Sequence, residues 1–153
     1  MSVRGKPLLY LAAPLFNEGE RSHNLKISAA LEIGFDVYLP QIDGALLPAL
    51  IASGLSAQEA KKQIFQNDLT AIQRCDVLLI VMNGRAIDEG AAFELGVAWT
   101  LNKPCFGFKD DFRQLVCDGD NPMIEGALIN TFTGLEELKA WATACSVNPT
   151  GFW

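Results

Sequence analysis

Residues 76–98, DVLLIVMNGRAIDEGAAFELGVA, contain the clearest indication of the fold of this chain. Residues 77–82 form an unbroken apolar run, which predicts a strand buried on both faces of a sheet. A short turn follows at residues 83–85, and the chain then enters an alanine-rich helix. A buried strand followed directly by a helix is the repeating unit of a parallel α/β sheet.

One carboxylate, Glu94, lies inside this helix between apolar neighbours. Helical side chains tilt toward the helix N-terminus, so the acid is expected over Gly90 and Ala91, which are small enough to leave open space. The helix begins near Asp88, and its dipole favours the ionised form of an acid near that end. An ionised acid beside an open space is suited to act as a covalent nucleophile. The alternative is a partly buried glutamate paired with an arginine or a lysine.

The rest of the chain repeats this alternation of elements. Strands are expected at residues 7–13, 35–39, 76–82, 105–108 and about 128–131. Helices are expected at residues 18–33, 57–74, 88–101 and 135–145, with shorter ones near 46–52 and 123–128. The pattern predicts one α/β domain over residues 1–153, a doubly wound parallel sheet of about five strands with helices on both faces, flavodoxin-like or Rossmann-like.

Local signals predict where several helices begin and end. Ser56 and Glu59 form a capping box, and Thr133 and Glu136 form a second one. Gly34 follows the first long helix, a position where glycine commonly ends a helix. The apolar spacing in that helix predicts an inward face made of Leu25, Ala29, Ala30 and Ile33.

Composition narrows the possible partners. The chain has 153 residues, 50% of them hydrophobic and 20% charged, which suits a packed core. A net charge of -6 and a pI of about 4.7 argue against nucleic acids and anionic membranes, but not against a neutral nucleoside. The apolar run at residues 8–16 is short and contains Pro14, so a core strand is expected there rather than a signal peptide. No run is long enough to span a membrane.

Neither a metal nor a cofactor is expected. The chain has one histidine, His23, and its cysteines at 75, 105, 117 and 145 lack the CxxC spacing of zinc sites. Cys75 and Cys105 are expected in the core, which fits a reducing cytoplasm. No glycine-rich dinucleotide loop, triphosphate loop or GxSxG elbow occurs. These absences argue against dinucleotide oxidoreductases, nucleoside triphosphatases and serine hydrolases.

Five polar side chains are expected near the carboxyl edge of the sheet. They are Tyr10 at the end of the first strand, Gln41 after the second, Asp88 and Glu94 after the third, and Asp68 on a helix that lines the same edge. Each has a simpler alternative role, such as a core tyrosine, a helix cap or a solvated surface residue. Several carboxylates converging on one cleft nevertheless favour a catalytic site.

Five segments spread over nearly the whole chain carry a recognisable pattern. They are YLAAPLF at 10–16, ND at 67–68 with IQRCD at 72–76, DEGAAFELG at 88–96, NKP at 102–104 and NPM at 121–123. In these segments the chain resembles the nucleoside 2-deoxyribosyltransferase family. The acid and glycine pattern around Glu94 is the most specific of them.

The resemblance implies a two-step transfer of 2-deoxyribose between nucleobases with net retention at C1′. Glu94 would attack C1′ of a 2′-deoxynucleoside, and a second free nucleobase would attack the resulting deoxyribosyl ester, with hydrolysis as a side reaction. Tyr10 would orient Glu94, Asp68 would handle the base proton and Asp88 would bind O3′. The resemblance implies no cofactor and no metal.

The resemblance also implies further substrate contacts. Gln41 would touch the base, and Phe16 and Gly90 are additional substrate-binding candidates. Asn121, on O5′, and Met123 would come from a neighbouring subunit. The active site would therefore be complete only in a homodimer or a homohexamer.

Two other functions remain open at the level of sequence. A related enzyme, the 2′-deoxynucleoside 5′-phosphate N-hydrolase, shares the tyrosine and the acids but has a Gly/Ser/Arg-rich loop after its first strand. Here Glu18 and Glu20 stand in that loop and Asn121 replaces a serine, which favours an unphosphorylated substrate, although Arg21 could approach a phosphate. A non-catalytic nucleotide-sensing module would use the same scaffold. Purine or pyrimidine preference and the role of residues 151–153 stay undecided.

Overall fold

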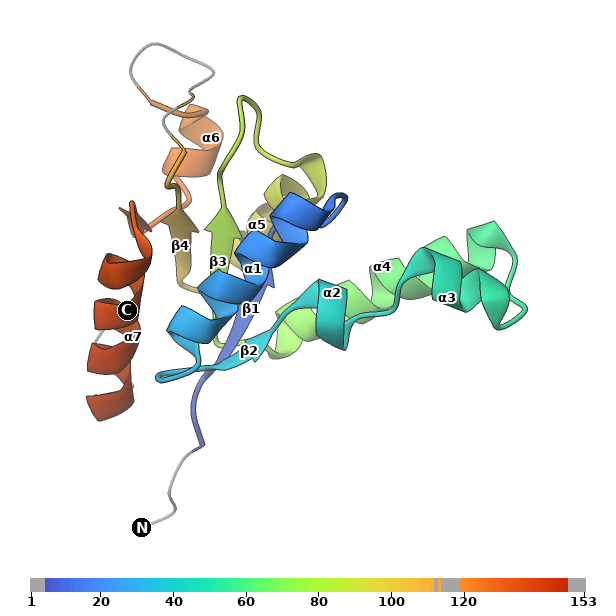
Figure 1. The fold of residues 1–153 in the computed structure, drawn as a ribbon, viewed down its shortest axis with the longest axis horizontal. Helices are drawn as coiled ribbons and strands as arrows, with labels where there is room; N and C mark the ends of the chain where they lie inside the picture. The colour runs from blue at the N-terminus through green and yellow to red at the C-terminus, as the bar shows by residue number, and fades with distance from the viewer. Residues whose placement is uncertain (1–4, 112, 114–118, 149–153) are drawn as a thin grey trace.

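The computed structural model describes residues 5–111, 113 and 119–148. It confirms the expected α/β fold, because a five-stranded parallel sheet carries helices on both faces (Figure 1). Cys117 and residues 151–153 lie outside the described residues.

The sheet places a crevice next to its first strand. Its members are β1 (Leu8–Ala12), β2 (Asp36–Tyr38), β3 (Val77–Val81), β4 (Cys105–Phe108) and β5 (Asn130–Phe132), in the order β2-β1-β3-β4-β5. Strand β3 is central and buried at every position, which accounts for its unbroken apolar sequence. The direction of winding reverses between β1 and β3. Open α/β sheets bind ligands at the carboxyl ends of the strands at such a point.

Four long helices cover the sheet and divide the core in two. Helices α1 (Glu18–Leu31) and α7 (Leu135–Val147) pack on one face, whereas α4 (Ala57–Arg74) and α5 (Glu89–Thr100) pack on the other. Because side chains alternate along a strand, Leu9 and Leu11 of β1 face α1 and α7, while Tyr10 and Ala12 face α4 and α5. This alternation places Tyr10 on the same face of the sheet as α5.

Three short helices complete the fold. Helices α2 (Pro40–Asp43) and α3 (Leu47–Ala52) follow β2, and α6 (Pro122–Glu125) precedes β5. Figure 1 shows α3 lying along α4, with both helices reaching beyond the β2 edge of the sheet. The segment around α2 therefore connects the sheet edge to α4.

The inward face of α1 differs from the expected one. Leu25 and Ile33 are 49% and 45% exposed, and the buried residues of the helix are Asn24, Ile27, Ser28 and Leu31. The apolar pattern was wrong here because two polar side chains are buried, and a pattern of hydrophobic residues does not reveal polar groups whose hydrogen bonds are satisfied inside the protein.

The helix caps agree with expectation only in part. The capping box of Ser56 and Glu59 is confirmed at the start of α4. The box expected from Thr133 and Glu136 is wrong, because Gly134 is the N-cap of α7 and makes no side-chain cap. Glu137 instead accepts hydrogen bonds from the backbone N–H and the hydroxyl of Thr133, at 2.8 and 3.2 Å.

Gly34 serves packing rather than helix termination by a left-handed residue. It is not among the glycines with positive φ. A Cβ atom at Gly34 would lie 2.1 Å from the carbonyl oxygen of Ala142 in α7. Glycine is therefore required because the chain after α1 closely approaches the backbone of α7.

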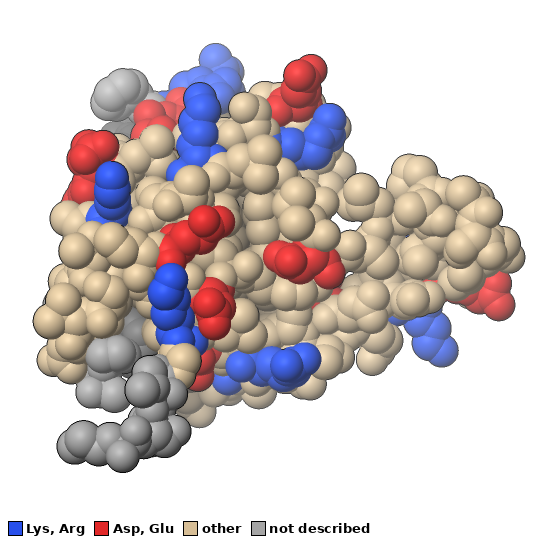
Figure 2. Space-filling model, turned by 60° about the horizontal axis from the view of Figure 1, so that its bottom comes forward, with Lys and Arg blue, Asp and Glu red and all other residues tan. Residues whose placement is uncertain are grey.

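Surface charge is mixed on the end of the molecule seen in Figure 2. Acidic and basic side chains are interspersed there, and neither kind forms a continuous patch. Among the described residues, no helix combines the length and apolarity that crossing a bilayer requires.

Candidate active site

A cleft opens at the carboxyl edge of the sheet, beside the point where the winding reverses. Its volume is about 270 Å³. Its walls come from the loop after β1, the segment after β2, α4 and the first turns of α5, and its lining residues include Leu15, Phe16, Leu46, Ile64, Asp68, Asp88, Gly90 and Glu94. Charged side chains in the described lining are all acidic, so this cleft suits a neutral ligand better than an anion.

Glu94 and Tyr10 form the central pair of this site. The Tyr10 hydroxyl donates a hydrogen bond to Oε1 of Glu94 at 2.7 Å. Tyr10 is completely buried, and its ring stacks on Tyr38 of the neighbouring strand at a centroid distance of 5.4 Å. The donor is thus held rigidly, and it fixes one carboxylate oxygen of Glu94 while that side chain reaches the cleft.

The protonation state of Glu94 differs from the expected one. Burial raises the pKa of Glu94 to about 7, the hydrogen bond from Tyr10 lowers it, and the charges of Asp68 and Asp88 raise it. Burial therefore outweighs the stabilisation of the ionised form that was expected from the helix dipole. A carboxyl group with a pKa near neutrality exchanges its proton readily at physiological pH.

Asp68 is the second acid with a shifted pKa. Burial raises the pKa of Asp68 to about 6. It reaches the cleft from α4, whereas Glu94 reaches it from α5, and the two carboxyl groups influence each other electrostatically. Their titrations are therefore coupled, and a proton on one favours ionisation of the other.

Asp88 both caps α5 and lines the cleft. Its Oδ2 accepts a hydrogen bond from the backbone N–H of Ala91 at 2.9 Å. A carboxylate accepts up to about four hydrogen bonds, so a ligand hydroxyl can bind the same group. The structural role anticipated from the sequence and a substrate-binding role are compatible.

Gly90 lies close to the Asp88 carboxylate, where a side chain would crowd it. A Cβ atom at Gly90 would lie 3.1 Å from Oδ2 of Asp88. Gly90, Asp68 and Glu94 also line a second cleft of about 270 Å³ between α4 and α5, together with Lys61, Phe65 and Phe93. Asp68 and Glu94 are therefore accessible from two clefts, both of which Gly90 also lines.

The two expected substrate contacts Phe16 and Gln41 differ in whether they line the cleft. Phe16 lines the cleft and is 76% exposed. The structure does not bring Gln41 into the lining. Both ends of its amide are bonded elsewhere, with Oε1 accepting from Asn24 at 2.9 Å and Nε2 donating to the Arg21 carbonyl at 3.0 Å.

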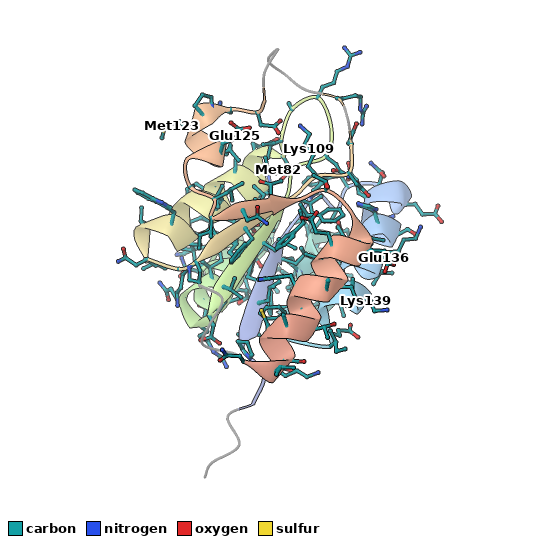
Figure 3. All side chains as sticks on the ribbon, turned by 90° about the vertical axis from the view of Figure 1, so that its left-hand side faces the viewer. Met82, Lys109, Met123, Glu125, Glu136 and Lys139 are labelled. Atoms are coloured by element: carbon teal, nitrogen blue, oxygen red, sulfur yellow. The ribbon has the colours of Figure 1, made fainter. Side chains whose placement is uncertain are left out.

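Asn121 and Met123 are not among the residues that line the cleft of their own chain. Asn121 caps α6, where its Oδ1 accepts from the N–H of Met123 at 2.9 Å. Met123 is 83% exposed and points outward from α6 (Figure 3). It borders a groove with Ala92, Leu95, Gly96 and Trp99 of α5, and Glu94 is not part of that groove.

Two residues next to the site, Tyr38 and Asn24, were not predicted from the sequence. Tyr38 stacks on the ring of Tyr10, which it faces across the two paired strands. Its place near the end of the second expected strand was the only indication of this role in the sequence. Asn24 is only 2% exposed and contacts both cleft loops, but an isolated asparagine in a helix carries no sequence signal of burial. Only the tertiary structure reveals it.

Comparisons with known proteins cover most of the chain. A profile for the family described as nucleoside 2-deoxyribosyltransferase matches residues 9–138. No curated protein matches.

Several solved structures share the fold. A conserved protein from Enterococcus faecalis V583 is 22% identical, over 92% of this chain and 99% of that chain, with a TM-score of 0.75. A 2-deoxyribosyltransferase from Bacillus psychrosaccharolyticus is 26% identical, over 86% and 90%, with a TM-score of 0.70. A 2-deoxyribosyltransferase from Leishmania mexicana is 21% identical, over 90% and 97%, with a TM-score of 0.61. Because the family profile spans most of its length, the chain belongs to the nucleoside 2-deoxyribosyltransferase family.

Proposed function

We propose that this protein transfers 2-deoxyribose between nucleobases through a covalent ester on Glu94. The observation that carries the proposal is the hydrogen bond of 2.7 Å between Tyr10 and Glu94 at the floor of a cleft that also holds Asp68 and Asp88. Family membership supports this chemistry, and the residues of the site have the properties that each step needs.

In the first step an oxygen of Glu94 forms a bond to C1′ while the bond between C1′ and the base nitrogen breaks. The electron pair of that bond leaves with the base, and Asp68 supplies a proton to it. In the second step a nitrogen of another base attacks C1′, the ester bond breaks, Glu94 regains its carboxylate, and Asp68 takes up the proton that this nitrogen loses. Two inversions give net retention. Water in place of the second base gives hydrolysis.

The pKa values of the two acids lie close enough for one proton to pass between them, as these roles require. Asp68 has a pKa of about 6, high enough to carry a proton for the leaving base. Glu94 has a pKa of about 7, and it must be ionised to attack. A proton placed on Asp68 removes a negative charge that opposes this ionisation. Asp88, fixed by its cap bond to Ala91, is the proposed partner of the sugar O3′.

We also propose that a second copy of the chain completes the site. Helix α5 is apolar on its outward side as well, where Trp99 is 57% exposed and borders a groove with Met123, while Phe93 is 55% exposed beside α4. A helix that is apolar all round is normally covered. Association through this surface in a homodimer or a homohexamer would supply Asn121 and Met123 to a neighbour's cleft.

The runner-up function is hydrolysis of a 2′-deoxynucleoside 5′-phosphate, and the start of α1 argues against it. The Glu20 carboxylate accepts hydrogen bonds from the N–H groups of Phe16 and Asn17 at 2.8 and 3.2 Å. Asn17 in turn accepts from the N–H of Glu20 at 2.9 Å. These are the donors that a phosphate uses at a helix N-terminus. A side-chain acid already occupies them, so an unphosphorylated nucleoside is the better substrate.

A base-exchange assay tests the proposal. The protein is incubated with a deoxynucleoside and a second free base, and the new nucleoside is separated by chromatography. Glu94→Gln should abolish exchange, while Glu89→Gln, an exposed acid on the same helix, should not. Full activity of the Glu94 variant would reject the mechanism, and a strong preference for the 5′-monophosphate would favour the runner-up.

A trapping experiment separates an enzyme from a binding module. A slowly reacting 2-fluoro nucleoside should leave a sugar adduct on Glu94 that mass spectrometry of peptides detects. Nucleoside binding with repeated absence of an adduct and of exchange would indicate a non-catalytic module.

A further inference from the structure

Asn24 and Gln41 connect three parts of the molecule beside the cleft. The buried Nδ2 of Asn24 in α1 donates to the carbonyl oxygen of Pro14 at 2.8 Å and to Oε1 of Gln41 in α2 at 2.9 Å. The Nε2 of Gln41 donates to the carbonyl oxygen of Arg21 in α1 at 3.0 Å. One helix thereby holds both the loop after β1 and the segment after β2.

These hydrogen bonds have only one consistent orientation. The partners of Asn24 Nδ2 and Gln41 Nε2 include backbone carbonyls, which only accept hydrogen bonds. Rotating either amide by half a turn would place an oxygen against a carbonyl oxygen. The Gln41 amide is therefore fixed in orientation by its bonds to α1, and its side chain does not line the cleft.

The two tethered segments form the apolar side of the cleft. Pro14 is followed by Leu15 and Phe16, and α2 leads into Ala45, Leu46 and Leu47, all of which line the cleft. Facing them are the carboxyl groups of α4 and α5. A nucleoside whose sugar lies over Glu94 would place its base between this apolar side and Asp68.

We propose that Asn24 and Gln41 form a clamp that positions the apolar side of the cleft, and that Gln41 does not read the edge of the base. This inference rests on the proposed function. Bases are then held by apolar contact and stacking, and the one polar interaction is proton transfer with Asp68. Discrimination among bases follows size and basicity, because the described lining offers no amide or hydroxyl side chain to their edges.

Kinetics of two variants test the clamp. Gln41→Met keeps the side-chain length but removes both hydrogen bonds, and Asn24→Leu removes the other half of the clamp. Each should raise KM about 5–30-fold for a purine and a pyrimidine deoxynucleoside alike, as expected for the loss of up to two hydrogen bonds of about 1 kcal/mol each. The kcat values and the purine-to-pyrimidine ratio of kcat/KM should stay within about 2-fold. The effect of the double variant should be smaller than the product of the two single effects, since the bond between Asn24 and Gln41 is lost in both.

A base-reading role for Gln41 predicts a different result. A site that hydrogen-bonds a substrate group discriminates strongly against substrates lacking it. A change of about 10-fold or more in the purine-to-pyrimidine ratio in Gln41→Met, with Asn24→Leu unchanged in that ratio, would overturn the clamp. A merely structural defect would lower the active fraction, and hence kcat, at unchanged KM. Gln58→Met, at an exposed position in the first turn of α4, is the matched control and should behave as wild type.

Amide hydrogen exchange tests the clamp without any activity. Both variants should accelerate exchange at residues 13–17 and 40–47, with α7 unchanged, and Asn24→Asp serves if Asn24→Leu does not fold. Equal exchange in variants and wild type would refute the clamp. If wild type exchanges no bases, the proposed function fails, while the hydrogen-exchange result still decides whether the clamp exists.

Discussion

At the scale of single residues, the charge of Glu94 is set by two opposing effects. Burial disfavours its carboxylate, and the Tyr10 hydroxyl stabilises it. The acid is therefore poised near neutrality rather than permanently ionised. Binding of a nucleoside would displace water from the cleft and strengthen both effects.

The first prediction concerns Tyr10→Phe. Because the hydrogen bond from Tyr10 lowers the pKa of Glu94, its removal raises that pKa. The acid limb of the kcat/KM profile should move to higher pH, with activity at pH 6 falling about 10-fold, as expected for a lost bond to a charged group. The profile should be measured for wild type and variant in the base-exchange assay. An unmoved acid limb would show that Tyr10 does not tune this acid.

The second prediction concerns stability. The pKa of Glu94 is raised from 4.5 to about 7, so between these pH values the folded protein binds a proton that the unfolded chain has released. Stability attributable to this group is present below pH 4.5 and is lost as the pH rises to about 7. Glu94→Gln has no such loss, and its unfolding free energy should gain roughly 3 kcal/mol on wild type across this range. Urea unfolding at pH 4.5 and pH 8 measures the difference. A constant difference between the two proteins would contradict the shifted pKa.

At the scale of elements, α1 and α7 meet so closely that one position tolerates no side chain. Gly34→Ala would place a Cβ against the carbonyl of Ala142, so the chain after α1 would have to move. We expect a loss of about 2–3 kcal/mol, typical of overpacking, measured by thermal unfolding. Gly5→Ala, with no heavy atom within 4 Å of the added Cβ, is the control and should leave the melting temperature unchanged.

Sequence patterns predicted some elements correctly and others wrongly. The apolar run of β3 predicted a buried strand because the run has the length of a strand and ends at a turn. The face of α1 was misassigned because Asn24 is buried with its hydrogen bonds made, and its partners come from segments 10 and 17 residues away. The second capping box was wrong because Glu137, rather than Glu136, bonds to Thr133.

At the scale of the whole molecule, the proposed assembly places Asn121 of one copy in the cleft of another. Glu94→Ala and Asn121→Ala should each lose most activity. Co-expressed with different tags, they should form mixed assemblies in which one site carries both wild-type residues. For random dimers this restores about one quarter of wild-type activity. Activity no higher than the mean of the two single variants would indicate that each site is built from one chain.

The sequence by itself determined the α/β architecture and most of the acidic site, because strand burial and helix periodicity are local patterns and Tyr10, Asp88 and Glu94 follow from strand ends. The hydrogen bonds of Gln41 and the raised pKa of Glu94 became apparent only in the tertiary structure. Gln41 follows a strand end as expected, yet its amide is bound by α1. Glu94 lies near the N-terminus of α5, which favours its ionised form, yet burial raises its pKa. Both outcomes depend on neighbours distant along the chain, and hydrogen bonding and desolvation arise only once those neighbours are packed together.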